Sequence, residues 1–321
     1  MRGAFFRGLM DLAAQDDRVY LLVGDLGFGV VEPFMQKFPK RFLNVGVAEQ
    51  NMTGVAAGLA LTGKIVFTYS IANFPILRCL EQIRNDVCYH RANVKIVSIG
   101  GGFSYGALGM SHHATEDLAI LRALPELTVI APGDPFEAEA ATHAAALLDG
   151  PCYLRLGRAG ETLVHESKPE FQIGRAIRVR QGDALTLIST GAMLRTAVDV
   201  ADRLAEKGTP VRVLSMHTIK PLDTDAVLAA AAETRAIVTI EEHSVAGGLG
   251  GAVAECLAES GELRVPFKRL GIPTSFSAPP GTQDYLREQC GLSVKSILGS
   301  LEPLLESVHA TGFLIRPGVT T

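Results

Sequence analysis

The sequence lacks tryptophan, has only 6 % aromatic residues, and contains no apolar run near the roughly 18 residues that a membrane-spanning helix requires. Its N-terminal stretch is interrupted by Arg7 and Asp11, which argues against the apolar core of a signal peptide and favours an amphipathic helix. These absences argue against a membrane protein and against an exported one. We therefore expect a cytoplasmic protein.

Cysteine and metal-ligand patterns are also missing. The five cysteines are odd in number, widely spaced and free of any C-x-x-C pair, so we expect reduced, structural thiols. The eight histidines include one adjacent pair, His112-His113, but no H-E-x-x-H or comparable ligand spacing, so we predict no metal site built from this chain alone. A formal net charge of -4 offers no basic surface for nucleic acid.

What the sequence does contain is an alternation of strands and helices. Its 321 residues are enough for about two domains. Runs typical of buried strands occur at Val19–Val23, Phe42–Val47, Ile65–Tyr69, Val94–Ile99, Leu127–Ala131 and Tyr153–Leu156. Because helical stretches separate these runs, residues 1–160 are predicted to form an α/β domain on a parallel sheet.

The second half repeats this pattern after an interruption. Residues 161–182 are polar, lack a sustained period and contain Pro169, which favours a linker across the surface. Strand-like runs then resume at Ala184–Ser189, Val211–Ser215, Ile237–Glu241 and Val265–Leu270. The predicted fold class is therefore α/β, with two successive parallel-sheet domains, the second spanning residues 183–321.

One acid, Glu49, stands where a strand turns into a helix. Apolar residues in Phe42–Val47 suit a short buried strand, and helical spacing begins at Met52. Gly54 and Gly58 carry no side chain, so another backbone or a flat ligand can approach this helix closely. An acid in a first helical turn is also favoured by the helix dipole, so a capping role is the alternative to a functional one.

The string NVGVAEQNM at residues 44–52 resembles, nearly letter for letter, the motif that holds the catalytic glutamate in transketolases and 1-deoxyxylulose-5-phosphate synthases. The resemblance covers nearly the whole chain and is strongest at residues 41–63. It implies a domain that binds the pyrimidine of thiamine diphosphate, followed by a transketolase-type C-terminal domain. It also implies that Glu49 exchanges a proton with the pyrimidine nitrogen, while the cofactor performs the carbon chemistry.

The same resemblance implies further contacts with the cofactor. Asp25 and Leu26 match an Asp-Leu pair near the cofactor in transketolases, although Asp25 also suits a helix cap or an Asx turn. Phe74 is the ring expected to stack on the aminopyrimidine, and Ile71 stands where the family has another aromatic. Without the family context, an aromatic before a proline is more often a core residue.

A glycine-rich loop, residues 100–113, follows the fourth strand and lacks the lysine and spacing of a P-loop. The Ser-His-His string that closes it resembles the Thr-His-Gln of transketolases, which implies that His112 is catalytic and contacts substrate, with His113 beside it. Histidines at helix starts are also common for structural reasons. In this alignment Gly100 and Leu108 replace a histidine and an aspartate that bind sugar in transketolases.

Two arginines match family residues that bind the substrate phosphate. Arg158 follows the sixth strand-like run, and Arg2 stands at the start of the first domain. Sugars or sugar phosphates are the substrates that this match implies. A solvated surface charge is the alternative for each arginine.

One family signature is missing. Related enzymes bind the diphosphate and its Mg²⁺ through Gly-Asp-Gly, whereas the Gly-Asp pairs at residues 24–25, 133–134 and 182–183 lack the third glycine. The resemblance therefore implies the C-terminal subunit of a split transketolase, inactive alone, whose N-terminal partner subunit holds most of the contacts with Mg²⁺ and diphosphate. We expect a heterotetramer with two copies of each chain, α2β2, around a homodimer core.

Such an enzyme moves a two-carbon ketol unit from a ketose donor to an aldehyde acceptor. Two alternatives remain. The beta subunit of a 2-oxoacid or acetoin dehydrogenase has the same two-domain plan, but its glutamate context differs from the string at residues 48–51. A non-catalytic regulatory subunit would instead bind a nucleotide at Gly247–Gly251, where glycines follow a strand and open a helix.

Overall fold

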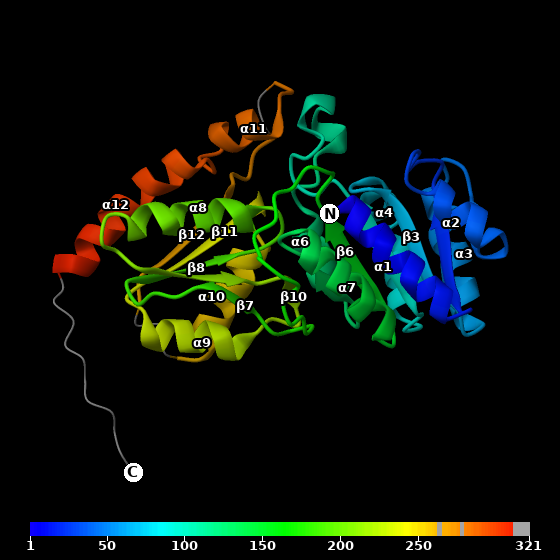
Figure 1. Ribbon diagram of the computed structural model, residues 1–321, viewed down its shortest axis with the longest axis horizontal. Coiled ribbons are helices and arrows are strands. Elements are labelled where there is room, and N and C mark those ends of the chain that lie inside the picture. Colours follow the sequence, from blue (N-terminus) through cyan, green and yellow to red (C-terminus); the bar gives the residue numbers. More distant parts are fainter. Residues whose placement is uncertain (262–264, 277–278, 311–321) are drawn as a thin grey trace, which may run out of the picture.

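The computed structural model describes residues 1–261, 265–276 and 279–310, so the end of the predicted second domain, residues 311–321, lies outside the described residues. Two α/β units lie side by side, the first coloured blue to green and the second green to red (Figure 1). Within the described ranges, no helix combines the length and the apolar character needed to cross a membrane.

A seven-stranded sheet forms the first unit, in the order β10-β5-β6-β4-β3-β1-β2. Its strands are β1 Val19–Val23, β2 Phe42–Asn44, β3 Ile65–Ile71, β4 Val94–Ile99, β5 Thr128–Ile130, β6 Cys152–Leu156 and β10 Thr218–Lys220. All neighbouring strands are parallel except β10 and β5. β4 and β6 are buried along their whole length, as expected for parallel strands covered by helices on both faces.

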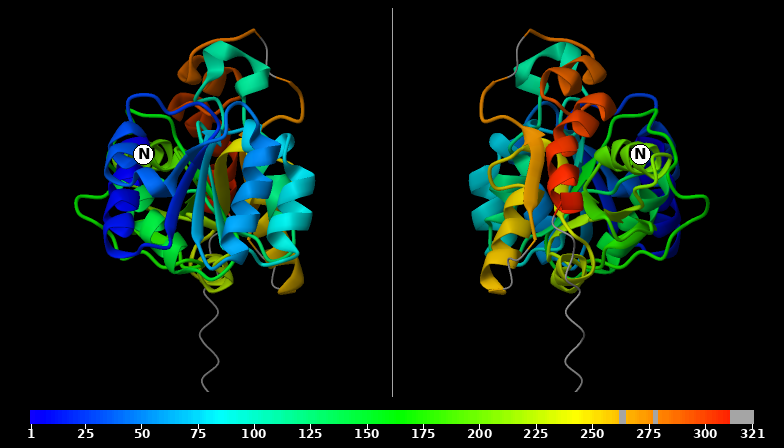
Figure 2. Two further views of the ribbon diagram at one scale, coloured as in Figure 1. Left: turned by 90° about the vertical axis from the view of Figure 1, so that its right-hand side faces the viewer. Right: turned by 90° about the vertical axis from the view of Figure 1, so that its left-hand side faces the viewer.

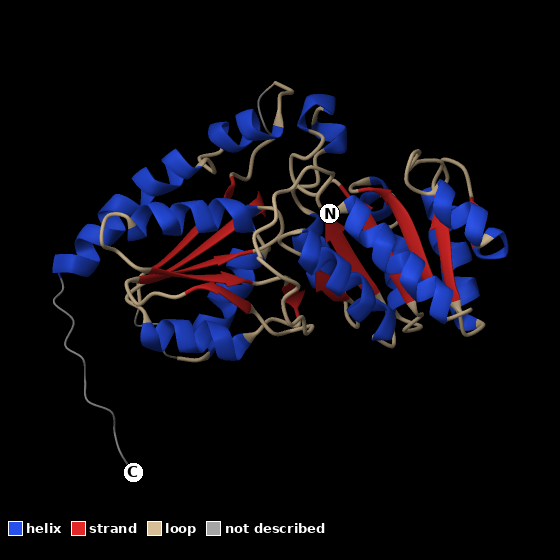
Figure 3. Cartoon of the chain, viewed as in Figure 1, coloured by secondary structure: helices blue, strands red, loops and turns tan. Residues whose placement is uncertain are grey.

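Helices lie on both faces of this sheet (Figure 3). On one face α1, Arg2–Gln15, packs against α7, Pro135–Leu147, and a Cβ on Gly8 would lie only 3.3 Å from the carbonyl oxygen of Glu139. The opposite face carries α3, Glu49–Leu61. The shorter elements are α2 Glu32–Lys37, η1 Pro39–Arg41, α4 Phe74–Leu77, α5 Leu80–Gln82, η2 Ile83–Cys88, η3 Gly106–Leu108, η4 Met110–His112 and α6 Asp117–Arg122.

A five-stranded sheet in the order β12-β11-β8-β9-β7 forms the second unit. Its strands are β7 Ile177–Arg180, β8 Leu185–Ser189, β9 Val211–Ser215, β11 Ile237–Ser244 and β12 Phe267–Ile272. Its helices are α8 Met193–Ala205, α9 Thr224–Glu233, α10 Leu249–Glu259, α11 Gln283–Gln289 and α12 Val294–Ala310. One apolar cluster continues across the boundary between the units, since Leu121 of α6 and Leu249 of α10 belong to it.

The prediction of two successive α/β domains on parallel sheets is confirmed, with a difference at one edge of each sheet. β10 follows β9 of the second unit but pairs antiparallel with β5 of the first, and β7 lies inside the segment predicted as a linker and pairs antiparallel with β9. Both strands are short. An edge strand has a hydrogen-bonded neighbour on only one side, so its direction is less constrained than that of an inner strand.

The chain between the sheets is tied to the start of α7. Asp134 caps this helix by accepting the N–H of Glu137 at 2.9 Å, and its other oxygen accepts the N–H groups of Val164 and His165 at 2.9 and 3.1 Å. The fully buried Glu137 accepts a hydrogen bond from Nε2 of His165 at 2.7 Å. Burial lowers the pKa of His165, but the hydrogen bond to Glu137 and the charges of Glu137 and Asp134 outweigh it and raise the pKa.

This geometry predicts a pH-dependent stability. Because the folded-state pKa of His165 is raised, its charged form stabilises the fold fully below the unfolded-state pKa of about 6.5, and this stabilisation is lost as pH rises through the folded-state value. Urea unfolding of wild type and His165→Gln should therefore give a difference in free energy that shrinks from about pH 6 to about pH 8. The exposed His90 supplies the control variant His90→Gln. A difference for His165→Gln that stays constant or grows with pH would contradict the assignment.

Candidate functional site

Neighbouring strands of the first sheet deliver the predicted site residues to one edge. β2, β1, β3, β4 and β6 are consecutive and parallel. Their carboxyl ends therefore meet at the same edge, which is where ligands bind in such sheets. The residues that follow these strands, in the spatial order of the strands, are Glu49, Asp25, Phe74, His112 and Arg158.

Glu49 is the first residue of α3 and is only 4 % exposed. Both of its carboxylate oxygens accept hydrogen bonds from Nη1 of Arg78, each at 3.1 Å. The helix has no side-chain cap, so the carboxylate is directed at Arg78 rather than at the helix N–H groups. A Cβ on Gly24 would lie 3.7 Å from Cγ of Glu49 and 3.9 Å from Oγ of Ser70, a buried oxygen without a hydrogen-bond partner among the described residues.

Arg78 lies between Glu49 and Phe74. Its guanidinium carbon is 4.1 Å from the centroid of the Phe74 ring, and its side chain is 48 % exposed. The guanidinium thus fills a slot with a carboxylate on one side and an aromatic face on the other. Sequence reasoning missed Arg78. Its position four residues after Phe74 is the signal that would have placed it beside this ring on a helix.

His112 is partly buried and lies beside Phe74. The two ring centroids are 5.2 Å apart in an edge-to-face arrangement, and Nδ1 of His112 is 3.0 Å from Oγ of Ser111. Burial and the charges of His113 and Arg78 lower the pKa of His112. The ring is therefore neutral near pH 7 and able to accept a proton.

His113 has a different environment. It is buried, packs edge-to-face against Phe103, and its Nε2 lies 3.2 Å from the carbonyl oxygen of Gly106. Its own carbonyl oxygen accepts a hydrogen bond from the side chain of Asn73. These contacts hold the loop together, so of the two adjacent histidines His112 is the one beside Phe74.

Tyr105 connects His112 to the predicted substrate arginines. Its ring centroid is 6.4 Å from that of His112 and 5.1 Å from the guanidinium carbon of Arg158. Burial raises the pKa of Tyr105, opposed by the charges of Arg158 and Arg2, so both arginines lie near this ring. Gly100 has a left-handed φ of +89°, and a Cβ there would lie 2.2 Å from the Tyr105 ring, so a side chain at this position would displace it.

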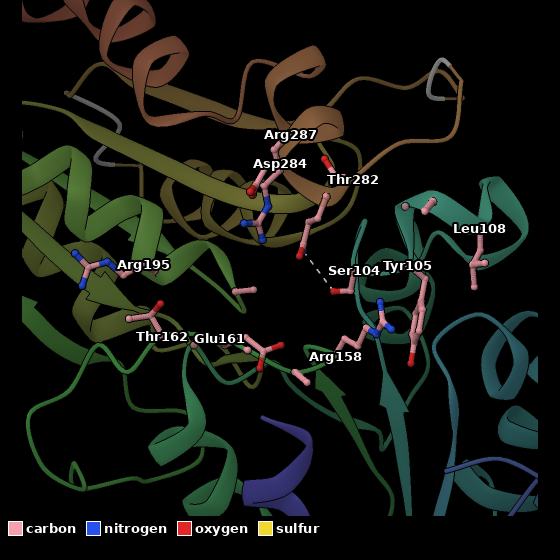
Figure 4. Close-up of a pocket in the computed structure, with 17 residues that line it drawn as sticks. Ser104, Tyr105, Leu108, Arg158, Glu161, Thr162, Arg195, Thr282, Asp284 and Arg287 are labelled. Atoms are coloured by element: carbon pink, nitrogen blue, oxygen red, sulfur yellow. Dashed lines mark hydrogen bonds between the residues drawn. The ribbon is translucent and has the colours of Figure 1, made fainter. Parts of the chain in front are cut away.

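A cavity of about 700 Å³ opens between the two units beside Arg158. Figure 4 shows Arg158 next to Tyr105, with Arg195 and Arg287 coming from the second unit. Arg195 pairs with Asp199 and Arg287 with Glu242, whereas among the described residues Arg158 has no carboxylate within ion-pair distance. Arg158 is therefore available for an anionic ligand.

Asp25 is exposed, has a left-handed backbone with a φ of 55°, and exchanges two hydrogen bonds with Asn44. The amide oxygen of Asn44 also accepts the N–H of Gly46 at 3.0 Å, so Asn44, which sequence reasoning missed, ties the loop after β1 to the turn that leads to Glu49. The remaining predicted cofactor contacts are partly buried and pack against the apolar core of the first sheet: Leu26 and Ile71.

The glycine-rich start of α10 is occupied by a carboxylate of its own chain. The N–H groups of Leu249 and Gly250 donate to the fully buried Glu241 at 2.7 and 2.8 Å. Burial raises the pKa of Glu241 to about 7, opposed by these hydrogen bonds. Because the N–H groups that would bind a phosphate already bind Glu241, this helix start is not available to a nucleotide.

Comparisons with known proteins identify domains of the transketolase family in this chain. The model of the transketolase pyrimidine-binding domain matches residues 1–160, and that of the transketolase C-terminal domain matches residues 174–297. The chain is 40 % identical over 307 residues to the 6-deoxy-6-sulfo-D-fructose transketolase subunit of a Clostridium species, covering 95 % of this chain and 94 % of that protein. It is 36 % identical over 282 residues to one of the subunits of the apulose-4-phosphate transketolase of Actinobacillus succinogenes, covering 88 % and 90 %.

A solved structure described as a split-gene transketolase, an inactive beta4 tetramer, matches the fold with a TM-score of 0.87 and 37 % identity, covering 95 % of this chain and 98 % of that one. These two relatives and this structure correspond to the chain over nearly their full length. Because the two domain models together span most of the sequence and agree with the order of the two sheets, this chain belongs to the transketolase family.

Proposed function

We propose that this chain is the C-terminal, pyrimidine-side subunit of a two-subunit transketolase that uses thiamine diphosphate and Mg²⁺ to move a two-carbon ketol unit from a ketose to an aldehyde. The observation that carries the proposal is the slot between Glu49 and Phe74. In this proposal residues 1–160 bind the pyrimidine, residues 161–182 link the domains and residues 183–321 form the C-terminal domain.

The residues of the slot fit an aminopyrimidine. A guanidinium is flat, donates N–H groups and stacks on aromatic faces, which a protonated aminopyrimidine also does. Arg78 therefore stands in for that ring, with Glu49 as acceptor and Phe74 as stacking surface. Its long, half-exposed side chain is able to swing out when the cofactor enters. Asp25, Leu26 and Ile71 remain proposed contacts at the rim of this slot.

Each side chain of this chain has a separate task in the proposed reaction. When bound, thiamine diphosphate supplies the chemistry that breaks and re-forms the carbon–carbon bond. Glu49 holds a proton at the pyrimidine nitrogen, and its burial strengthens that hydrogen bond by excluding water. His112, neutral near pH 7, moves a proton at a substrate hydroxyl oxygen. His113 supports the loop from beneath at the same end of the site.

The substrate is proposed to be a sugar with an anionic end, such as a sugar phosphate. Arg158 and Arg2 lie together near Tyr105, and among the described residues neither has an ion-pair partner. The names of two relatives specify a sulfo-sugar and a sugar phosphate, both of which are anionic. Leu108, 56 % exposed in the wall of the cavity, presents an apolar side chain where a sugar hydroxyl would otherwise find a carboxylate.

The helix that begins at Glu49 and the segments next to it leave apolar side chains exposed. Val47, Leu61 and Leu77 are 73 %, 61 % and 50 % exposed, and a Cβ on Gly54 or Gly58 would meet nothing within 4 Å. Leu61 lies on this helix, Val47 in the turn before it and Leu77 on the neighbouring α4, and exposed apolar groups that gather in one region are typical of a protein interface. We propose that this surface packs in the homodimer core of a cytoplasmic α2β2 enzyme. The N-terminal subunit of that enzyme binds the diphosphate and supplies most of the ligands of Mg²⁺.

The alternatives are less well supported. A nucleotide-binding regulatory subunit would need the start of α10, where Glu241 already accepts the N–H groups. A 2-oxoacid or acetoin dehydrogenase subunit would have relatives of that kind, whereas two relatives that match this chain over most of their length are named as transketolase subunits.

Replacing Glu49 by glutamine tests the proposed proton relay. Glu49→Gln keeps the size of the side chain but removes its titratable proton, so kcat of the copurified complex should fall about 10²–10⁴-fold. Steady-state kinetics measure this, and Glu81→Gln, at an exposed position, is the matched control. Near-normal turnover would refute the assignment. A helix-capping role would show instead as a loss of about 1 kcal/mol in stability with turnover kept.

Alanine variants of the two adjacent histidines should differ in whether they lower kcat or stability. His112→Ala should lower kcat about 100-fold with little change in melting temperature, because its ring faces Phe74 and solvent rather than the core. His113→Ala should instead lower the free energy of unfolding by about 1–3 kcal/mol, because it removes a buried hydrogen bond. Kinetics and thermal unfolding of both variants decide the matter, and the reverse ranking of kcat would move the catalytic role to His113.

The isolated chain should bind thiamine diphosphate poorly. Its slot holds only the pyrimidine side and is filled by Arg78, and the sequence carries no Gly-Asp-Gly for the diphosphate. Titration calorimetry with cofactor and Mg²⁺ should give a Kd weaker than about 0.1 mM for the chain alone. The complex with its partner subunit is the positive control. Submicromolar binding by the chain alone would contradict the division of the cofactor site between two subunits.

A further inference from the structure

The loop that carries Tyr105 and His112 closes on itself at its base. The N–H of Gly102 donates to the carbonyl oxygen of Ala114 at 2.9 Å, and the N–H of Ala114 donates back to Gly102 at 3.0 Å. Figure 2 shows this segment, in teal, standing beside the orange α11 of the second unit. The part of the loop that carries Tyr105 and His112 therefore projects from a base formed by Gly102 and Ala114, and its position depends on what holds that base.

The base is held by a carboxylate from the second unit. Glu242, on β11, is 2 % exposed, and its Oε1 accepts the N–H of Phe103 at 2.7 Å. The same carboxylate accepts hydrogen bonds from Nε2 of Gln283 at 3.0 Å and from Nε of Arg287 at 3.0 Å. Glu242 is thus a buried acid whose charge is balanced by Arg287 of the same unit. Its Oε1 also binds the loop of the first unit.

A second buried group fastens the other end of the base. Arg155, on β6 and 5 % exposed, donates from Nη2 to the carbonyl oxygens of Ala114 and Glu242 at 2.8 and 3.0 Å. Its Nε donates to Asp117 at 2.8 Å. Glu242 therefore holds the base of the loop in two ways. Its backbone carbonyl binds Arg155, and its side chain binds the N–H of Phe103.

Two glycines of the loop lie where the second unit leaves no room for a side chain. Gly102 has a left-handed φ of +65°, and a Cβ there would lie 2.7 Å from Cγ of Glu242. A Cβ on Gly106 would lie 2.6 Å from the carbonyl oxygen of Gly281, next to α11. The backbone of the loop thus lies directly against the second unit at both places.

We infer that Glu242 is a positioning residue for ketol transfer, an inference that rests on the proposed function. By binding the N–H of Phe103, it sets the place of Tyr105 and His112 relative to Phe74. The pyrimidine slot is built on other elements, at the start of α3 and on α4. Loss of the Glu242 contact should therefore impair turnover while leaving cofactor binding intact.

Paired variants separate the hydrogen bond from the buried charge. E242M/R287M removes the acceptor and its balancing cation together, and because buried ion pairs can be replaced by apolar residues without loss of stability, we expect this variant to fold. E242Q/R287M keeps an amide oxygen for the N–H of Phe103. E255A is the matched control, because Glu255 is an exposed carboxylate that pairs with Arg122 across the same boundary between the units.

Kinetics of each complex, copurified with the partner subunit, give the first readout. E242M/R287M should lower kcat about 100-fold, as a displacement of about 1 Å at a catalytic group does, with the Kd for thiamine diphosphate unchanged. E242Q/R287M should recover most of this loss, and E255A should match wild type. An equal loss of kcat in both double variants, or no loss in either, would overturn the inference.

Hydrogen exchange in peptides from residues 102–114 gives a second readout that does not depend on activity. Exchange should be faster in E242M/R287M than in E242Q/R287M, and equal exchange would overturn the positioning role. Faster exchange with unchanged kcat would show that Glu242 holds the loop but does not affect turnover, and would overturn the inference that it positions residues for ketol transfer. A wild-type complex that transfers no ketol unit would refute the proposed function instead, and the exchange comparison would still decide whether Glu242 holds the loop.

Discussion

Parallel pairing of β2, β1, β3, β4 and β6 is the constraint on which the site depends. Because these strands run in one direction, the residues that follow each strand lie at the same edge of the sheet. Side chains from these residues contact one another in a continuous series. The series runs from Glu49 through Arg78 and Phe74 to His112, and onward through Tyr105 to Arg158. Glu49, the proposed acid for the cofactor, and Arg158, the proposed cation for the substrate, thus stand at opposite ends of this series of contacts.

The pair of Glu49 and Arg78 also matters for the stability of this chain. A carboxylate that is 4 % exposed is costly without a partner, since an uncompensated buried charge destabilises a fold by several kcal/mol. Arg78 compensates this charge within the chain, and its stacking on Phe74 covers an aromatic face that would otherwise meet water. The same side chain is long and half exposed, so it can yield its place to a flat ligand with equivalent donors.

The second unit contributes contacts that hold parts of the first unit in place. Glu242 holds the base of the loop and accepts a hydrogen bond from Arg155 of the first unit, β10 extends the first sheet, and an apolar cluster runs across the boundary. The glycines of residues 100–113 suggest a flexible segment when they are considered alone. In the structure Gly100 and Gly102 mark close approaches, to Tyr105 and to Glu242, where any Cβ would collide.

The sequence by itself determined the α/β alternation, the acid at the start of a helix, and the family. It also showed that the chain has the pyrimidine-side motif but lacks Gly-Asp-Gly. These features are local, because hydrophobic periodicity and short motifs involve residues that are neighbours in the chain. Only the tertiary structure decided that Arg78 pairs with Glu49, that His112 rather than His113 lies beside Phe74, and that β10 joins the first sheet. The physical reason is that burial and hydrogen bonding depend on which distant segments the fold brings together, and no local pattern specifies those partners.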